Sequence, residues 1–234
     1  MDITTSVGNF KKADSFVAVD VLRASATICY GLKGGVKSFR LVKDLGSALS
    51  TPKGKYLRIG EKHGMKVRGL DIANSPREIT ERNVKGREAV FYSDNLARVL
   101  SSYGGGKTVF IGTFCNAKAL AKVLKRYGSV NFVACTYRRL GPLFFWEDLI
   151  GIGKIIHELS KLERLELDRL SSFCLNAYRR LGRAALLLCP NVYYTALIAG
   201  VREIELATEE NNIDIVPACI SKEGGIMVKP SNMK

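Results

Sequence analysis

Short apolar runs recur along the first 135 residues, and they constrain the fold more than any other feature of the chain. Such runs, rich in Val, Ile, Phe and Tyr, are typical of strands that are buried on both faces of a sheet. The runs are residues 16–22, 36–42, 56–59, 89–92, 109–111 and 132–135. Segments with helical spacing or helix signals lie between most of them. Strand alternating with helix predicts a largely parallel sheet with helices on both faces.

The second part of the chain has a different texture. Residues 146–200 are rich in Leu, Ala, Arg and Lys at helical spacing, and Pro190 is the clearest break. Residues 213–220 return to strand character in spite of Pro217, which predicts an edge or terminal strand. No repeat or linker divides the chain. We therefore predict one domain over residues 1–234, of the α/β class, with three α/β/α layers, a mostly parallel or mixed central sheet and a helix-rich C-terminal half.

The composition is that of a folded protein, with 47% hydrophobic and 25% charged residues. No apolar stretch approaches the roughly 20 residues that span a membrane. Lys11, Lys12 and Asp14 precede the first apolar run, which does not fit a signal peptide. We therefore expect a cytoplasmic protein with no membrane partner. The six cysteines occur singly and there are two histidines, so a zinc site is not predicted.

The formal net charge of +14 is the strongest compositional signal. Such an excess attracts polyanions and also speeds the capture of small anions. The Lys and Arg residues are scattered, with no basic tail and no recognisable nucleic-acid-binding module. Nucleic-acid binding therefore stays open without being specified, and so does a homo-oligomer.

The first candidate site lies where the run at residues 16–22 ends. Asp20 stands near the carboxyl end of the predicted strand, the edge at which open α/β sheets build ligand sites. Arg23 and Ser25 fall in the first turn of the next predicted helix, whose free N–H groups favour an anion. An acid that suits a hard metal therefore lies beside a cradle for an anion, as phosphate chemistry requires. The structural alternative is an Asp that caps its own helix.

The second candidate segment is residues 60–78. Glu61 follows the run at residues 56–59 and should reach the same sheet edge as Asp20, while Asp71 lies in the irregular stretch beyond it. Ser75-Pro76-Arg77-Glu78 is a capping box with proline at the first helical position, which gives Ser75 and Glu78 a structural role. Asn74 and Arg77 remain free to face a ligand.

Other polar residues follow further predicted strands. They are Asp94, Asn116 and the adjacent pair Glu147 and Asp148. The structural alternatives are helix N-caps and, for the pair, acids that complement a helix dipole. Clustered carboxylate oxygens suit Mg²⁺ better than zinc.

Several segments resemble the 2-phosphosulfolactate phosphatase family, in the family's order along nearly the whole chain. A D-V-L-R-A-(S/T)-(S/T)-T-like segment is similar to residues 20–27, and G-E-x-x-G-x-x-x-x-G-x-D-x-x-N-S-P-x-E to residues 60–78. G-x-F-x-N-A matches residues 112–117, an E-D pair matches Glu147-Asp148, and Val216-Pro217 resembles the terminal strand.

The resemblance implies a three-layer fold and Mg²⁺-dependent hydrolysis of a small anionic phosphate monoester. The family's reaction turns 2-phosphosulfolactate into sulfolactate and phosphate, a step towards coenzyme M. We assign residues to this reaction from their positions in the sequence. The expected metal ligands are Asp20, Glu61 and one of Glu147 and Asp148. The expected substrate-binding residues are Arg23, Ser25, Asn74, Arg77 and Asn116. The expected catalytic residues are Asp20, Arg23 and Asp71, with Asp71 as either the base or a further metal ligand.

Two segments depart from the family pattern. Ser93-Asp94-Asn95-Leu96-Ala97 replaces a T-(T/S)-N-G-T run, and the side chain of Leu96 could block close approach of the backbone to a ligand. Ala134-Cys135-Thr136 replaces a C-A-G-like strand end and precedes a loop with Arg138, Arg139 and Gly141. The alternative hypothesis is therefore a catalytically altered member that binds an anionic metabolite or nucleic acid without turnover.

Overall fold

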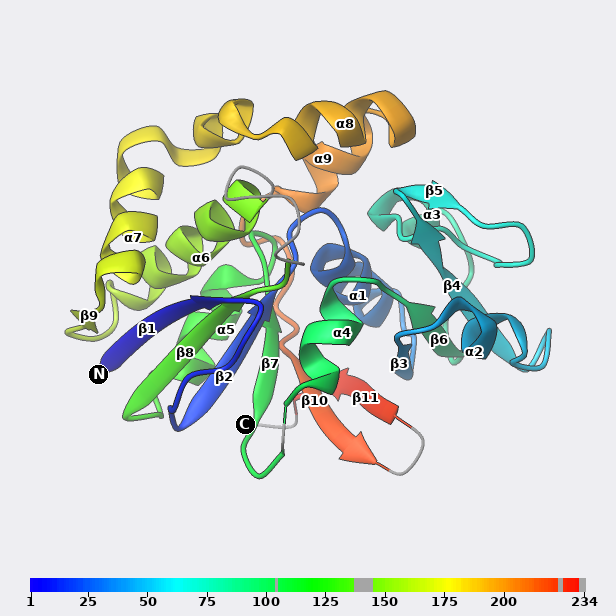
Figure 1. The fold of residues 1–234 in the computed structure, drawn as a ribbon, viewed down its shortest axis with the longest axis horizontal. Coiled ribbons are helices and arrows are strands. Elements are labelled where there is room, and N and C mark those ends of the chain that lie inside the picture. Colours follow the sequence, from blue (N-terminus) through cyan, green and yellow to red (C-terminus); the bar gives the residue numbers. More distant parts are fainter. Residues whose placement is uncertain (104, 137–144, 223–224, 232–234) are drawn as a thin grey trace.

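A computed structural model describes residues 1–103, 105–136, 145–222 and 225–231; Arg138, Arg139 and Gly141 lie outside these ranges. In the described part of the chain eleven strands form one sheet, in the order β5-β4-β6-β3-β11-β10-β7-β2-β8-β1-β9 (Figure 1). The strands are β1 Asp2–Val7, β2 Ser15–Val19, β3 Ser38–Val42, β4 Tyr56–Lys62, β5 Met65–Lys66, β6 Glu88–Tyr92, β7 Val109–Gly112, β8 Ser129–Ala134, β9 Glu166–Leu167, β10 Pro217–Lys222 and β11 Gly225–Pro230.

Helices connect most of these strands, as the alternating pattern predicts. They are α1 Ala24–Lys33, α2 Leu45–Leu49, α3 Pro76–Thr80, α4 Leu96–Ser101, α5 Ala117–Leu124, α6 Trp146–Leu159, α7 Arg169–Leu181, the 3₁₀ helix η3 Gly182–Leu188, α8 Pro190–Ala199 and α9 Val201–Ala207. The α/β class, the mixed sheet and the helix-rich C-terminal half are confirmed.

The sheet consists of two parallel blocks joined by an antiparallel hairpin. β3, β4 and β6 form one block, with the short β5 paired antiparallel to β4 at its edge, and β1, β2, β7, β8 and β9 form the other. β10 and β11 lie between the blocks and pair antiparallel with each other, with β7 and with β3.

The prediction of an edge or terminal strand near Pro217 was wrong, because β10 is an interior strand of the sheet. Pro217 is the first residue of β10 and lies opposite Pro230, the last residue of β11. At the first position of a strand a missing N–H does not interrupt the ladder. The backbone pairing with β7 begins one residue later, at Ala218.

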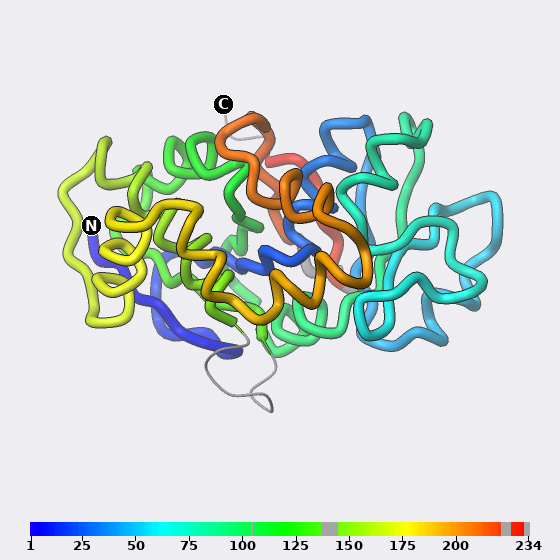
Figure 2. The backbone as a smooth tube through the Cα atoms, turned by 90° about the horizontal axis from the view of Figure 1, so that it is seen from above, coloured from blue at the N-terminus to red at the C-terminus, as the bar shows by residue number. Residues whose placement is uncertain are grey.

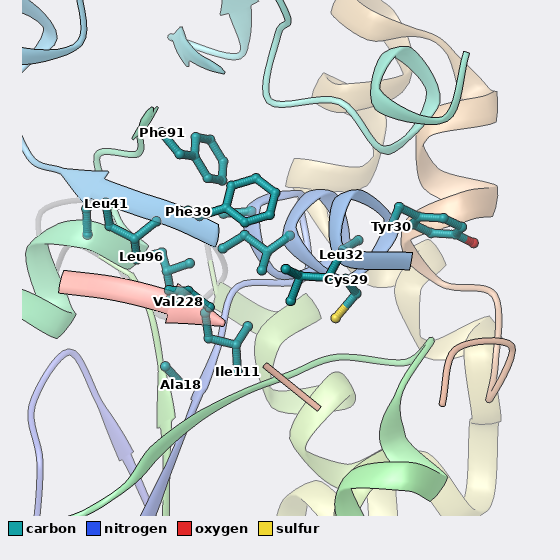
Figure 3. Packing of buried hydrophobic residues seen from close by; sticks show 14 of the residues in the cluster. Ala18, Cys29, Tyr30, Leu32, Phe39, Leu41, Phe91, Leu96, Ile111 and Val228 are labelled. Carbon is teal, nitrogen blue, oxygen red and sulfur yellow. The ribbon is translucent and has the colours of Figure 1, made fainter. Parts of the chain in front are cut away.

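The burial of β2 shows the layers directly. Phe16 and Ala18 belong to a core cluster with residues of α1 and α4, while Val17 and Val19 belong to a second cluster with residues of α5 and α6. Successive strand residues point to opposite faces, so helices cover both faces of the sheet. Part of the first cluster is seen in Figure 3, which labels Ala18, Ile111 and Val228 of the sheet and Cys29, Tyr30 and Leu32 of α1.

The C-terminal helices cross from one block to the other. From above, the orange segment of α8 and α9 lies between the yellow α7 and the cyan segment around β4 and β5 (Figure 2). α9 packs against α1 and α3, and η3 packs against α6 and α7. No single helix in the described ranges has the length and hydropathy to cross a membrane; Arg169–Leu188 and Pro190–Ala199 meet that test only as a pair bent by 52°.

Candidate active site

Asp20 directly follows β2 and is buried at the start of α1. Its Oδ1 accepts a hydrogen bond from the Ala24 N–H at 3.3 Å, and its own N–H donates to Ser25 Oγ at 3.0 Å. The pKa of Asp20 is raised to about 7, chiefly by burial and in part by the charge of Glu61, against the hydrogen bond from Ala24 and the charge of Arg23. Arg23 holds the N-cap position of α1, but the Asp20 carboxylate accepts the N–H of the first helical residue, which is close to the structural alternative, and Asp20 also belongs to a cluster of acids.

The first turn of α6 brings Glu147 and Asp148 to Asp20. Asp148 Oδ1 accepts a hydrogen bond from the Val21 N–H at 2.8 Å. Burial raises the pKa of Asp148 well above its usual value, and the charges of Glu147 and Asp20 add to this effect. Burial likewise raises the pKa of Glu147 to about 7. Both acids of the pair therefore lie at the end of β2, where the sequence could place only one.

The two oxygens of Glu147 differ in their surroundings. Oε1 accepts a hydrogen bond from Asn191 Nδ2 at 2.6 Å, whereas Oε2 is buried and has no hydrogen-bond partner among the described residues. A buried carboxylate oxygen without a donor is costly. A cation or a water molecule at Oε2 would remove that cost.

Glu61 and Arg23 approach the same place from different strands. Glu61, near the end of β4, accepts a hydrogen bond from the Gly64 N–H, and burial raises its pKa. Arg23 is 3% exposed and donates from Nη2 to the Gly64 carbonyl at 2.7 Å. Arg23 Nη1 also lies 3.7 Å from Glu203 Oε2 on α9. The phosphate-binding candidate therefore contacts both the turn after β4 and a helix of the C-terminal half.

A cavity of about 460 Å³ lies where these segments meet. Its walls come from the ends of β2, β4, β6 and β8 and from α8. The lining residues are Leu22, Arg23, Glu61, His63, Gly64, Asn74, Asp94, Asn95, Thr136, Pro190, Asn191, Tyr194, Thr195 and Ile198. A larger cavity, of about 590 Å³, lies between α4 and the β10–β11 hairpin and is lined by none of Arg23, Glu61 and Asn74, so we place the site in the smaller one.

Helix α8 closes one side of the cavity against the turn after β4. The Tyr194 hydroxyl donates to the His63 carbonyl at 2.9 Å. Gly64 has a φ of +77°, and a Cβ there would overlap Ile198 Cδ1. Neither α8 nor Glu203 was expected in the site, because residues 184–201 carry no charge and Glu203 stands among ordinary helical acids.

Several expected site residues have structural partners instead of a place in the cavity wall. Ser25 is fully buried, and its Oγ accepts a hydrogen bond from the Asp20 N–H. Asn116 Oδ1 accepts a hydrogen bond from the Thr113 N–H, and Asn116 Nδ2 donates to the carbonyls of Ile111 and Ile215. Asp71 accepts a hydrogen bond from the Arg58 N–H at 2.9 Å and pairs with the Arg58 guanidinium at 3.6 Å.

Two other expectations concern the helix α3. Asn74, just before it, lines the cavity and accepts a hydrogen bond from Thr27 Oγ1 at 2.9 Å. The Ser75 cap is confirmed, because Ser75 Oγ accepts the Glu78 N–H at 2.9 Å. The Glu78 carboxylate accepts from the Ala73 N–H and pairs with Lys66. Arg77 is partly exposed and pairs with Glu203 at 3.6 Å.

The side chain of Leu96 does not obstruct the cavity. Leu96 is fully buried in the core cluster beside α1, and its N–H donates to Ser93 Oγ at 3.2 Å and lies near enough to Asp20 to lower the pKa of that acid. The expectation of a blocked backbone approach was wrong, because the backbone at this position faces the acid while the side chain packs into the core. The altered segment therefore keeps a contact with the site.

The acids fit a divalent cation by their chemistry. Across the described ranges no group of three or more His, Cys, Asp or Glu side chains is drawn together at metal-binding distances. However, the raised pKa values of Asp20, Glu147 and Asp148 report buried, mutually repelling carboxylates, and Glu147 Oε2 lacks a partner among the described residues. Divalent cations with oxygen ligands relieve both the repulsion and the missing contact.

The fold and the cavity define an α/β protein with an acidic, arginine-containing site, of the kind used by hydrolases of phosphate esters. Residues 3–222 match the family model described as 2-phosphosulpholactate phosphatase. The chain belongs to this family.

Curated relatives carry the same name. A probable 2-phosphosulfolactate phosphatase of Carboxydothermus hydrogenoformans is 28% identical over 222 residues, which cover 93% of this chain and 91% of the relative. The 2-phosphosulfolactate phosphatase of Methanocaldococcus jannaschii is 29% identical over 215 residues, 88% of this chain and 89% of the relative. A probable 2-phosphosulfolactate phosphatase of Caldanaerobacter subterraneus is 28% identical over 164 residues, which cover 68% of this chain and 67% of the relative.

Proposed function

We propose that this protein hydrolyses 2-phosphosulfolactate to sulfolactate and phosphate, with Mg²⁺ as cofactor. The observation that carries the proposal is a cavity lined by Arg23, Glu61 and Asn191, of which Asn191 donates a hydrogen bond to the buried Glu147, in a chain of this family. The names of the relatives support the substrate.

Asp20, Glu147 and Asp148 would hold Mg²⁺, with Glu61 across the cavity as a further oxygen ligand. When bound, the ion would neutralise phosphoryl oxygens and lower the pKa of a bound water. Glu147 Oε2 is a buried oxygen of this cluster without a hydrogen-bond partner among the described residues, and a cation or a water would supply one. Asp71 takes no part in this proposal, because Arg58 engages its carboxylate.

Arg23 would bind the phosphate. Its Nη2 is held by the Gly64 carbonyl, and no other hydrogen bond of its guanidinium is found among the described residues. The remaining N–H groups can donate to phosphoryl oxygens, on which negative charge spreads in the transition state. Asn74, in the cavity wall, would contact the rest of the substrate.

Phosphate release from 2-phosphosulfolactate, with Mg²⁺ and with EDTA, tests this function. We expect metal-dependent release, and slower release from 2-phospholactate, which lacks the sulfonate. Equal rates for both esters would reject the proposed substrate. No release from any phosphomonoester, by protein with a cooperative unfolding transition, would reject the reaction.

The net charge of +14 favours the alternative of a family member that binds polyanions without turnover. That alternative predicts nucleic-acid affinity that falls steeply with salt. Absence of such binding at low salt would remove it. The expectation of a cytoplasmic protein stays a prediction.

A further inference from the structure

We propose that Glu203 is a positioning residue that holds Arg23 of the cavity wall in place and links it to Arg77 of α3. This inference rests on the proposed function, because it assigns phosphate binding to Arg23. It adds a residue of the C-terminal half that neither the motifs nor the comparisons assign.

Glu203 lies on α9 and is 1% exposed. Its Oε1 accepts a hydrogen bond from the Ser75 hydroxyl at 2.5 Å and lies 3.6 Å from Arg77 Nε. Its Oε2 lies 3.7 Å from Arg23 Nη1 and has no hydrogen-bond partner among the described residues. One buried carboxylate therefore contacts the segment after β2 and the first turn of α3.

Burying a carboxylate is costly, so Glu203 needs the charged and hydrogen-bonding partners that surround it. A charged group away from water is tolerated when it is paired and hydrogen-bonded. Two arginines and a hydroxyl supply that compensation here. Because Ser75 caps α3 and Arg77 belongs to α3, the same contacts attach α9 to the helix that begins beside the cavity.

Glu203 also determines with which acidic side chain the Arg23 guanidinium pairs. Asp20 and Glu61 act electrostatically on Arg23, as Glu203 does. Without Glu203, the guanidinium would be drawn towards the acids assigned to the metal. With Glu203 in place, one edge of the guanidinium faces α9, and donors remain for an anion in the cavity.

Binding of inorganic phosphate measures the arginine site without requiring turnover. Isothermal titration calorimetry with phosphate, in the presence of Mg²⁺, would compare the wild type with Glu203→Gln. We expect about tenfold weaker phosphate binding, the loss of about one charge-assisted contact. With 2-phosphosulfolactate we expect a similar rise in KM and less than about a threefold change in kcat.

Glu205→Gln is the matched control. Glu205 lies on the same helix, but it is half exposed and pairs with Arg202 at 2.9 Å. It changes the net charge equally and should leave phosphate binding unchanged. In an Arg23→Lys background, Glu203→Gln should lose most of its effect, because the two residues act through one contact. Should Glu203→Gln unfold, Glu203→Asp, which keeps the charge on a shorter side chain, should also weaken phosphate binding.

Phosphate binding that is equal in wild type and folded Glu203→Gln would overturn the inference. So would an equal loss in Glu205→Gln, or an absence of phosphate binding by the wild type. A wild type that binds phosphate but hydrolyses no ester would reject the proposed reaction, and the phosphate titration would still decide the role of Glu203.

Discussion

Asp20, Glu147 and Asp148 are ordinary acids in the sequence and unusual ones in the structure. Each is nearly or fully buried, and burial is the first cause of each raised pKa. A protein that buries several carboxylates together gives up folding stability unless a cation joins them. The cluster is therefore expected to make the metal-free protein less stable than its core alone would allow.

Asp20→Asn tests this cost directly. In EDTA at pH 8, removing the charge of Asp20 should raise the free energy of unfolding by about 1–3 kcal/mol. The raised pKa of Asp20 reflects the free-energy cost of keeping its carboxylate charged in the folded protein, and the variant avoids that cost. Thermal and urea denaturation measure the change.

Asp71→Asn is the control for this prediction. Asp71 is more exposed and pairs with Arg58, so the substitution should leave stability unchanged or lower it. A less stable Asp20→Asn in EDTA would contradict the strain attributed to the acid cluster.

The sequence predicted part of the site for a clear reason. Acids at the ends of buried strands, such as Asp20 directly after β2 and Glu61 near the end of β4, are placed by the strand itself. Ser25 and Asn116 make side-chain hydrogen bonds with nearby backbone, and their place in substrate binding stays a prediction. Glu203 could not be found, because its role depends on how α9 packs against α3.

At the scale of elements, α8 and the turn after β4 are far apart in the sequence but together form one wall of the cavity. The Tyr194–His63 hydrogen bond and the contact of Ile198 with Gly64 hold them together. The close approach requires a glycine, for its positive φ and for its missing Cβ. The position of α8 therefore controls the shape of the cavity proposed to bind the substrate.

Gly64→Ala should damage catalysis through this contact. The backbone strain should cost about 1 kcal/mol of stability, and the displaced α8 should lower kcat/KM about tenfold. Steady-state kinetics and thermal denaturation measure the two effects.

Gly54→Ala separates strain from contact. Gly54 has a φ of +87°, and no atom lies within 4 Å of the position that a Cβ would take there. The variant should therefore lose similar stability but keep its activity. Equal kcat/KM for the two variants would contradict the role given to α8.

The apolar runs predicted six of the strands, because buried parallel strands are nearly continuous in Val, Ile and Phe. β1 was missed, since its Thr4, Thr5 and Ser6 do not form an apolar run, although Thr5 and Ser6 are buried. The interior position of β10 could not be predicted either. It depends on pairing with β7 and β11, which the local sequence does not specify.

For the whole molecule, the acid cluster predicts how stability depends on pH. Between its ordinary pKa of 3.8 and its folded pKa of about 7, Asp20 holds a proton in the folded state and lacks one in the unfolded state. Lowering the pH therefore favours folding in this window. The free energy of unfolding of the metal-free protein should rise as the pH falls from about 8 to about 5.

The Asp20→Asn variant isolates this effect in denaturation curves. His157, whose lowered pKa acts in the opposite direction, is present in both proteins, so their difference reports Asp20. The wild type should gain stability relative to the variant as the pH falls, and saturating Mg²⁺ should remove the gain. Parallel curves without metal would contradict the prediction.

The net charge of +14 predicts a salt effect on substrate capture. Long-range attraction of an anionic ester is screened at high ionic strength. Raising NaCl from about 20 mM to about 500 mM should lower kcat/KM several-fold while kcat changes less. A kcat/KM that does not depend on salt would indicate that the scattered charge has no part in capture.

The buried acids after β2 and in the first turn of α6 are proposed to support metal-dependent phosphate hydrolysis. The most direct test is phosphate release from 2-phosphosulfolactate by the wild type and by Asp20→Asn, each with Mg²⁺ and with EDTA. We predict release by the wild type with Mg²⁺ alone, and a loss of at least about a hundredfold in the folded variant. Undiminished release by Asp20→Asn, or by the wild type in EDTA, would contradict this role of the acids.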